Sequence, residues 1–169
     1  LGSTTVICTD KTGTLTQNRM RVKRLYFADG EYGYDAARLA TEDGPGRRRL
    51  FEIARHCHAL REVVAGGSTR LLGDPMEVTL LEMARQAPGA TYPRRDEIAF
   101  DSDRKRFSAL HATPDGHVLY CKGALEAILS LCTEGEARDG AIVLTAAGRE
   151  RLGAGESALA QDGMRVVAF

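Results

Sequence analysis

A short apolar run that leads directly into an aspartate lies near the start of the printed sequence. Residues 4–8 (Thr-Thr-Val-Ile-Cys) are mostly β-branched, which is typical of a buried strand. The turn that follows, residues 10–14 (Asp-Lys-Thr-Gly-Thr), lies where open α/β sheets bind ligands, beyond the carboxyl end of a strand. Its backbone N–H groups and hydroxyls suit a phosphate, and the carboxylate of Asp10 can attack a γ-phosphate to form an aspartyl-phosphate.

The composition indicates a globular chain and excludes several partners. Of the 169 residues, 43% are hydrophobic and 27% are charged, which fits one folded domain or one domain and part of a second. A formal net charge of +0 gives no indication of nucleic-acid binding. No run of 18 apolar residues predicts a membrane-spanning helix, and four cysteines without paired spacing favour a reducing, cytosolic setting.

From residue 20 onward the pattern predicts an antiparallel sheet with helices, an α+β fold. Asp74 before Pro75 predicts the start of one helix, and Thr145 predicts the start of another. The predicted strands are 20–27, 31–34, 94–100, 104–111, 116–120 and 164–169, and the predicted helices are 47–60, 75–86, 125–132 and 145–161.

Several residues in this later region have the chemistry of a nucleotide site, although each has an ordinary structural explanation too. Phe100 at a strand end can stack on a purine or can lie in the core. Lys122 is a cation beside Gly123, where backbone can approach a ligand closely, although Lys-Gly-Ala can also be a simple turn. Glu77 can accept a hydrogen bond from an exocyclic amine or can serve only the helix dipole, and Arg165 can pair with a phosphate or remain a solvated edge charge.

Residues 56–58 (His-Cys-His) carry three side chains that can bind a metal ion. On a helix, alternate residues point to roughly opposite sides, so His56 and His58 would not converge on one ion. The sequence therefore does not predict a metal site there.

Residues 10–18 (Asp-Lys-Thr-Gly-Thr-Leu-Thr-Gln-Asn) resemble the phosphorylation signature of P-type cation-transporting ATPases. The resemblance implies that Asp10 is phosphorylated and that Lys11 offsets phosphate charge. It also implies that the Thr12 carbonyl and Asp10 help to hold Mg²⁺ and that Thr14 contacts the phosphoryl group. Related phosphatases place a second aspartate where Thr12 stands, so the resemblance implies a longer-lived phosphoenzyme.

The order of four later motifs resembles the nucleotide-binding domain of the same ATPases. These motifs are Gly-Asp-Pro-x-Glu (73–77), Phe-x-Ser-Asp-Arg-Lys (100–105), Lys-Gly-Ala (122–124) and Gly-Met-Arg-Val (163–166). The resemblance implies that Glu77 and Phe100 contact adenine and that Lys122 and Gly123 lie in the ATP pocket. It also implies that Lys105 and Arg165 face the nucleotide. Ser102 departs from the arginine of animal calcium pumps, which removes one expected phosphate contact.

Together the two resemblances predict the organisation and function of the chain. Residues 1–19 are expected to hold one strand of an α/β phosphorylation domain and its loop, and residues 20–169 the nucleotide-binding domain. The expected function is that of the ATP-binding, phosphoryl-accepting part of a cation pump of the calcium and sodium/potassium class, with calcium as the first expected ion. The chain is expected to be a cytoplasmic domain of an integral membrane protein. The expected ligands are ATP and Mg²⁺, and the expected partners are the remaining phosphorylation, actuator and transmembrane domains.

Two alternatives stay open at this point. One is a small phosphatase of the same superfamily that uses Asp10, and the other is a nucleotide-binding module without catalysis. The family's Thr-Gly-Asp, Gly-Asp-Gly and Thr-Gly-Glu segments do not occur in the sequence. Because the first two complete the Mg²⁺ site, we expect this chain by itself to bind ATP with little or no turnover.

Overall fold

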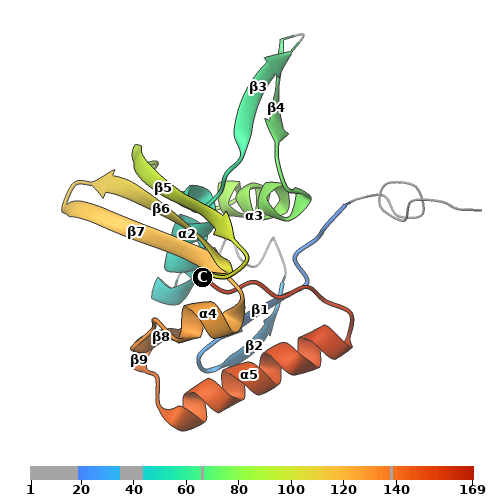
Figure 1. Cartoon of the computed structure of the whole chain (residues 1–169), viewed down its shortest axis with the longest axis vertical. Coiled ribbons are helices and arrows are strands. Elements are labelled where there is room, and N and C mark those ends of the chain that lie inside the picture. The colour runs from blue at the N-terminus through green and yellow to red at the C-terminus, as the bar shows by residue number, and fades with distance from the viewer. Residues whose placement is uncertain (1–18, 35–43, 66, 138) are drawn as a thin grey trace, which may run out of the picture.

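The computed structural model describes residues 19–34, 44–65, 67–137 and 139–169 (Figure 1). Its elements are β1 (Arg24–Phe27), β2 (Gly30–Gly33), α2 (Pro45–His56), β3 (Arg61–Ala65), β4 (Ser68–Leu72), α3 (Pro75–Arg85), β5 (Arg94–Asp101), β6 (Arg106–Thr113), β7 (Gly116–Gly123), α4 (Leu125–Leu129), β8 (Glu134–Ala137), β9 (Gly140–Val143) and α5 (Ala146–Gln161). All strand pairs among these elements are antiparallel. The predicted α+β class is confirmed, although the strands form four separate sheets rather than one.

Helices α2 and α3 build the main hydrophobic core together with β1. Helix α3 begins where the sequence predicted, because the Asp74 side chain accepts a hydrogen bond from the Met76 N–H at 2.7 Å and Pro75 occupies the first turn. Strand β1 alternates exposed and buried residues, so one of its faces turns to the helices. The buried members of this core are Leu25, Phe27, Phe51, Ala54, Leu80, Met83 and Ala84.

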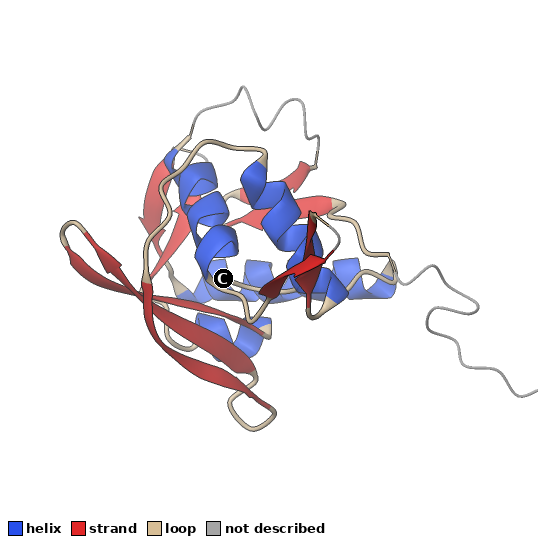
Figure 2. Ribbon diagram, turned by 90° about the horizontal axis from the view of Figure 1, so that it is seen from above, coloured by secondary structure: helices blue, strands red, loops and turns tan. Residues whose placement is uncertain are grey.

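The sheet β5-β6-β7 carries the second core. Residues Cys57, Phe107, Ala109 and Tyr120 are buried together where α2 ends against β6 and β7. Strands β6 and β7 pair without a shift from Arg106 opposite Gly123 to Thr113 opposite Gly116. Figure 2 shows the helices gathered at the centre of the molecule, with the long strands projecting to one side.

The prediction of a C-terminal strand at 164–169 is wrong. The segment contributes an isolated bridge between Gly123 and Ala168, and its remaining residues form no strand. The apolar run 166–169 instead packs beside the helices, since Val167 and Phe169 contact the core of α2, α3 and β1.

Other elements also differ from the prediction, among them β1, which begins at Arg24, and the unpredicted strands β8 and β9. Helix α2 ends at His56, because the chain turns at Cys57 to enter the second core, and α4 ends at Leu129. The hairpin β3–β4 was not predicted, because its described residues are exposed or only half-buried and its sequence lacks the alternation of a half-buried strand. This hairpin projects from the body of the molecule (Figure 1).

Within the described residues, no helix combines the length and the apolar character needed to cross a bilayer.

Candidate functional site

Most of the nucleotide-binding candidates lie at one end of the sheet β5-β6-β7. In the strand register Phe107 lies opposite Lys122, and Arg106 lies opposite both Gly123 and Asp101. A register shift between Ile98 and Asp101 gives β5 an extra residue at this end. Phe100 lies within this irregularity and is 64% exposed, so its ring is available for stacking.

Lys122 and Glu77 form an ion pair beneath this exposed edge. Lys122 is 5% exposed and Glu77 is 8% exposed, and the Lys122 ammonium donates a hydrogen bond to Glu77 Oε1. The second carboxylate oxygen, Oε2, accepts a hydrogen bond from the Ala59 N–H at 3.1 Å. The ammonium also lies 5.4 Å from the centre of the Phe107 ring, within cation–π range.

This pairing changes the expected role of Glu77. Charges buried to this degree are stable only when they are paired and hydrogen-bonded, so Glu77 is first a partner for Lys122. A carboxylate accepts about four hydrogen bonds, and its two oxygens accept two from Lys122 and Ala59. The carboxylate therefore retains acceptor capacity for a ligand amine.

His58 is a neighbour of this pair that the sequence did not single out as a binding residue. Burial, together with the positive charges of Arg94 and Lys122, lowers the pKa of His58 to about 4, while the carboxylate of Glu77 and the backbone of Arg55 act in the opposite direction. At neutral pH the ring is therefore uncharged. Its Nδ1 atom is buried without a hydrogen-bond partner among the described residues. The only sequence signal was the His-Cys-His triplet, which suggested metal chemistry instead.

His56 is held by backbone groups. Its Nδ1 lies 2.7 Å from the Glu52 carbonyl oxygen, and its Nε2 accepts a hydrogen bond from the Tyr92 N–H at 3.0 Å. Both ring nitrogens are thus engaged. Among the residues that the structure describes, no group of three or more histidine, cysteine, aspartate or glutamate side chains could hold a metal ion.

The loop between β5 and β6 fixes the backbone of Lys105. Asp101 Oδ1 accepts hydrogen bonds from the N–H groups of Asp103 and Arg104 at 2.9 and 3.0 Å, and these bonds lower the pKa of the Asp101 carboxyl. Lys105 has a φ of +52°, and its N–H donates to the Asp101 carbonyl at 2.7 Å. A non-glycine residue in this left-handed region is uncommon and marks a closely specified turn.

Gly123 is required because the Lys105 backbone passes directly against it. A Cβ at position 123 would lie 2.2 Å from the Lys105 carbonyl oxygen and 2.8 Å from the Arg106 Cα. The next residue, Ala124, donates its N–H to the same Lys105 carbonyl at 3.0 Å. The Lys-Gly-Ala motif therefore joins the end of β7 to the β5–β6 loop.

The Lys105 side chain forms an ion pair with Glu126 in the first turn of α4. The Nζ–Oε1 distance is 2.8 Å, and both side chains are more than half exposed. The hydrogen bond raises the pKa of Lys105 and lowers the pKa of Glu126.

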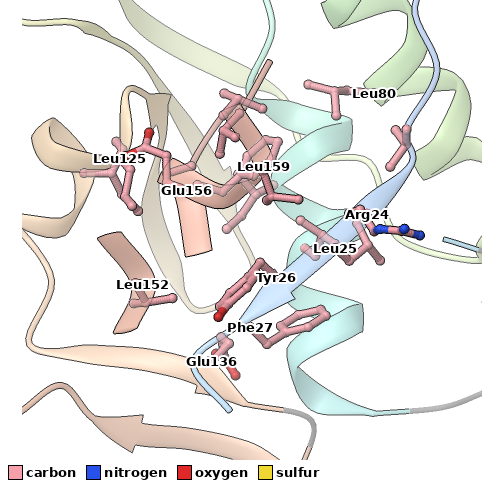
Figure 3. Close-up of a pocket in the computed structure, with 18 of the residues that line it drawn as sticks. Arg24, Leu25, Tyr26, Phe27, Leu80, Leu125, Glu136, Leu152, Glu156 and Leu159 are labelled. Atoms are coloured by element: carbon pink, nitrogen blue, oxygen red, sulfur yellow. The ribbon is translucent and has the colours of Figure 1, made fainter. Parts of the chain in front are cut away.

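The structure does not bring Arg165 into contact with the other candidates. Arg165 is exposed and lines a cavity of about 850 Å³ that β1, α2, α4 and α5 enclose. Figure 3 shows Tyr26 and Phe27 on one wall of this cavity and Leu152, Glu156 and Leu159 on another. The side chains of Glu77, Phe100, Lys105 and Lys122 are not part of its lining.

The predicted phosphorylation residues lie outside the described part of the chain. This applies to Asp10, Lys11, Thr12 and Thr14, and therefore also to the Mg²⁺ site expected at Asp10 and Thr12. The structure leaves these assignments, and the domain boundary at residue 19, as predictions.

The described part of the chain has the architecture of a known domain. Residues 48–169 match the model of the P-type ATPase cytoplasmic domain N, which covers more than half of the chain. The chain therefore belongs to the P-type ATPases, and its fold class agrees with that of domain N.

Relatives among known proteins are similar over most or all of the chain. It is 35% identical to the probable cation-transporting ATPase F of Mycobacterium bovis, over 84% of this chain and 18% of that protein. It is 32% identical to the calcium-transporting ATPase 1 of Bacillus cereus, over 100% of this chain and 19% of that protein. A calcium-transporting ATPase of Listeria monocytogenes is 38% identical over 79% of this chain and 15% of its own length. The chain thus spans less than a fifth of the length of these three relatives.

Proposed function

We propose that this chain binds ATP within a cation-transporting P-type ATPase and accepts the γ-phosphoryl group on Asp10. The observation that carries the proposal is the buried Lys122–Glu77 pair, which lies at the same end of the sheet β5-β6-β7 as the exposed Phe100 ring. Phe100 supplies a flat apolar surface for a purine, and the pair supplies polar groups at the same end of the sheet. The loop ammonium of Lys105 supplies charge for the phosphates.

His58 lies close to the Lys122–Glu77 pair, because the charges of both residues act on its pKa. Its buried Nδ1 has no protein partner in the described residues, and a neutral imidazole can exchange one hydrogen bond with a purine edge. Burying an unpaired polar atom is unfavourable, so a ligand that pairs with it binds more tightly. His58 is therefore a proposed contact for the base that the sequence motifs did not suggest.

The proposed chemistry at the other end of the nucleotide is phosphoryl transfer. A carboxylate oxygen of Asp10 forms a bond to the γ-phosphorus while the bond to the β–γ bridging oxygen breaks and ADP leaves. Lys11 and Thr14 orient the phosphoryl group and offset its charge. Asp10 and the Thr12 carbonyl are the oxygen ligands that Mg²⁺ prefers, and the ion would neutralise charge on the transferred group.

The parent protein is proposed to be a calcium-type pump that includes actuator, phosphorylation and transmembrane domains. Two of the relatives named above are calcium-transporting ATPases, which supports this class. The chain alone is expected to bind ATP with little turnover. Rapid hydrolysis of a generic phosphate ester by this chain would favour the phosphatase alternative instead.

A titration of ATP, ADP and GTP followed by amide NMR tests the pocket. We expect adenine-selective shifts near residues 77, 100 and 122 that weaken at least several-fold in Phe100→Ala and Lys122→Ala. Leu119→Ala is the matched control, because Leu119 is also an exposed apolar residue of the sheet, 55% exposed, but lies opposite Leu110, away from the site. Because Phe100 is exposed, Phe100→Ala keeps the fold. Saturable binding that is unchanged in Phe100→Ala, or no binding at all, would overturn the proposed pocket.

A further inference from the structure

The ion pair between Lys105 and Glu126 places a carboxylate beside the ammonium that is proposed to meet the nucleotide phosphates. The two charged atoms are 2.8 Å apart, and the side chains are 55% and 59% exposed. A ligand can therefore reach either group without unfolding the surrounding structure. This pair is unlike Lys122–Glu77, whose side chains are 6% and 11% exposed.

The backbone holds these two side chains as neighbours. Lys105 is fixed by its left-handed turn and by hydrogen bonds through both its N–H and its carbonyl group. The carbonyl accepts from Ala124, and α4 begins at the next residue, so Glu126 follows within the first turn of the helix. The pairing is a consequence of the Lys-Gly-Ala geometry rather than a chance meeting of two flexible side chains.

The neighbouring cations have other partners. Lys122 pairs with Glu77, and the Arg104 guanidinium donates to the Ser108 hydroxyl and to the Ala99 carbonyl. The Arg106 guanidinium donates to the Arg104 carbonyl at 3.3 Å. Lys105 is thus the loop cation whose partner is a solvent-exposed carboxylate that a ligand can replace. Its availability to a ligand depends on how strongly Glu126 holds it.

We propose that Glu126 sets the affinity of this site for nucleotide phosphates, because its carboxylate competes with them for the ammonium of Lys105. The inference rests on the proposed nucleotide site and deepens it. When a phosphate approaches, Glu126 must release the ammonium and then remains as a like charge close by. Both effects weaken binding of the phosphate groups and leave binding of the base unchanged.

The test measures dissociation constants of ATP and adenosine for the full 169-residue chain and its variants by amide NMR at low and at moderate salt. We expect Glu126→Gln to tighten ATP binding by about three- to tenfold at low salt, with a smaller effect at moderate salt. Adenosine binding should stay the same. In a Lys105→Gln background the same Glu126→Gln change should tighten ATP binding less than in the wild-type background, because the competition is gone and only the charge repulsion remains.

Asp115→Asn is the matched control, since it changes the net charge equally at the turn between β6 and β7, at the far end of the sheet. Equal tightening by Asp115→Asn, weaker binding in Glu126→Gln, or the full effect persisting without Lys105 would overturn the role of Glu126. If the wild-type chain binds ATP through Phe100 but Glu126→Gln changes nothing, this inference alone fails. If the wild-type chain binds no ATP, the proposed function fails with it.

Discussion

Two lysine–glutamate pairs lie at the same end of one sheet, and they differ most in their exposure to water. Lys122–Glu77 is buried, and Lys105–Glu126 is more than half exposed. In water the attraction between such charges is weak and easily replaced, whereas a buried charge that loses its partner remains without solvation. The buried pair is therefore a fixed part of the structure, and the exposed pair can exchange its partner for a ligand.

The largest loss of stability is expected when one member of the buried pair is removed and the other is left. Glu77→Ala leaves the Lys122 ammonium buried without a counter-charge, so we expect the free energy of unfolding to fall by about 3–5 kcal/mol. Urea unfolding followed by circular dichroism measures this loss. The double variant Glu77→Gln with Lys122→Met should recover part of it, because no unpaired charge remains.

The control for this prediction is an exposed ion pair, one member of which, Arg85, lies on the same helix as Glu77. Glu62→Ala removes the partner of Arg85 at the end of α3, where the side chains are 57% and 50% exposed. We expect a much smaller loss of stability than for Glu77→Ala. Similar losses in the two variants would mean that burial does not separate the two kinds of pair.

The next largest effect concerns the backbone contact that links the two pairs. Gly123→Ala would put a Cβ 2.2 Å from the Lys105 carbonyl, and neither backbone can move freely. We expect a loss of about 1–3 kcal/mol in the free energy of unfolding, together with amide shifts at Lys105 and Glu126. Gly153→Ala in α5 is the control, because a Cβ there meets open space, and it should stabilise the helix by about 0.5–1 kcal/mol. An unchanged free energy of unfolding in Gly123→Ala would contradict the close packing of this contact.

A smaller effect is expected from acidification, through the histidine beside the buried pair. The pKa of His58 is lowered from 6.5 to about 4, so the folded state favours the neutral ring. The unfolded chain binds the proton first, and stability should therefore fall as pH decreases from about 6.5 towards 4. His56, whose pKa burial also lowers, acts in the same direction.

Urea unfolding of the wild-type chain and of His58→Asn across this pH window separates the two contributions. We expect the slope of stability against pH to become shallower in His58→Asn, because asparagine does not titrate. An unchanged slope would show that His58 is accessible to protons in the folded state.

The parts of the fold that depend on local chemistry could be predicted from the sequence. Asp74 and Thr145 cap the helices that they were expected to begin, since a side-chain oxygen at that position satisfies a free N–H group whatever the rest of the chain does. The long antiparallel pair β6–β7 followed from its turn residues for the same reason. The segment 164–169 was misjudged, because an apolar run shows that a segment is buried and does not show what it pairs with.

The candidate site was less accessible to sequence reasoning, because its contacts join distant residues. The family resemblance placed Glu77 and Lys122 in one pocket, but their ion pair spans 45 residues and appears only in the folded chain. Glu126 had a sufficient explanation as an acidic residue in the first turn of a helix, so nothing in the sequence distinguished it. His58 became notable only through the burial of a ring nitrogen, which depends on tertiary packing.

The smallest effect is expected when the exposed pair is broken, and this result completes the comparison. Glu126→Gln removes one charge but leaves Lys105 solvated, so the urea midpoint should match that of the wild-type chain within experimental error. The backbone bonds of Lys105 to Asp101 and Ala124 do not involve the carboxylate, and they keep the loop in place. A loss of stability as large as that of Glu77→Ala would show that the exposed pair is structural. It could not then release Lys105 to a phosphate at low cost, and the distinction between a fixed pair and an exchangeable pair would no longer hold.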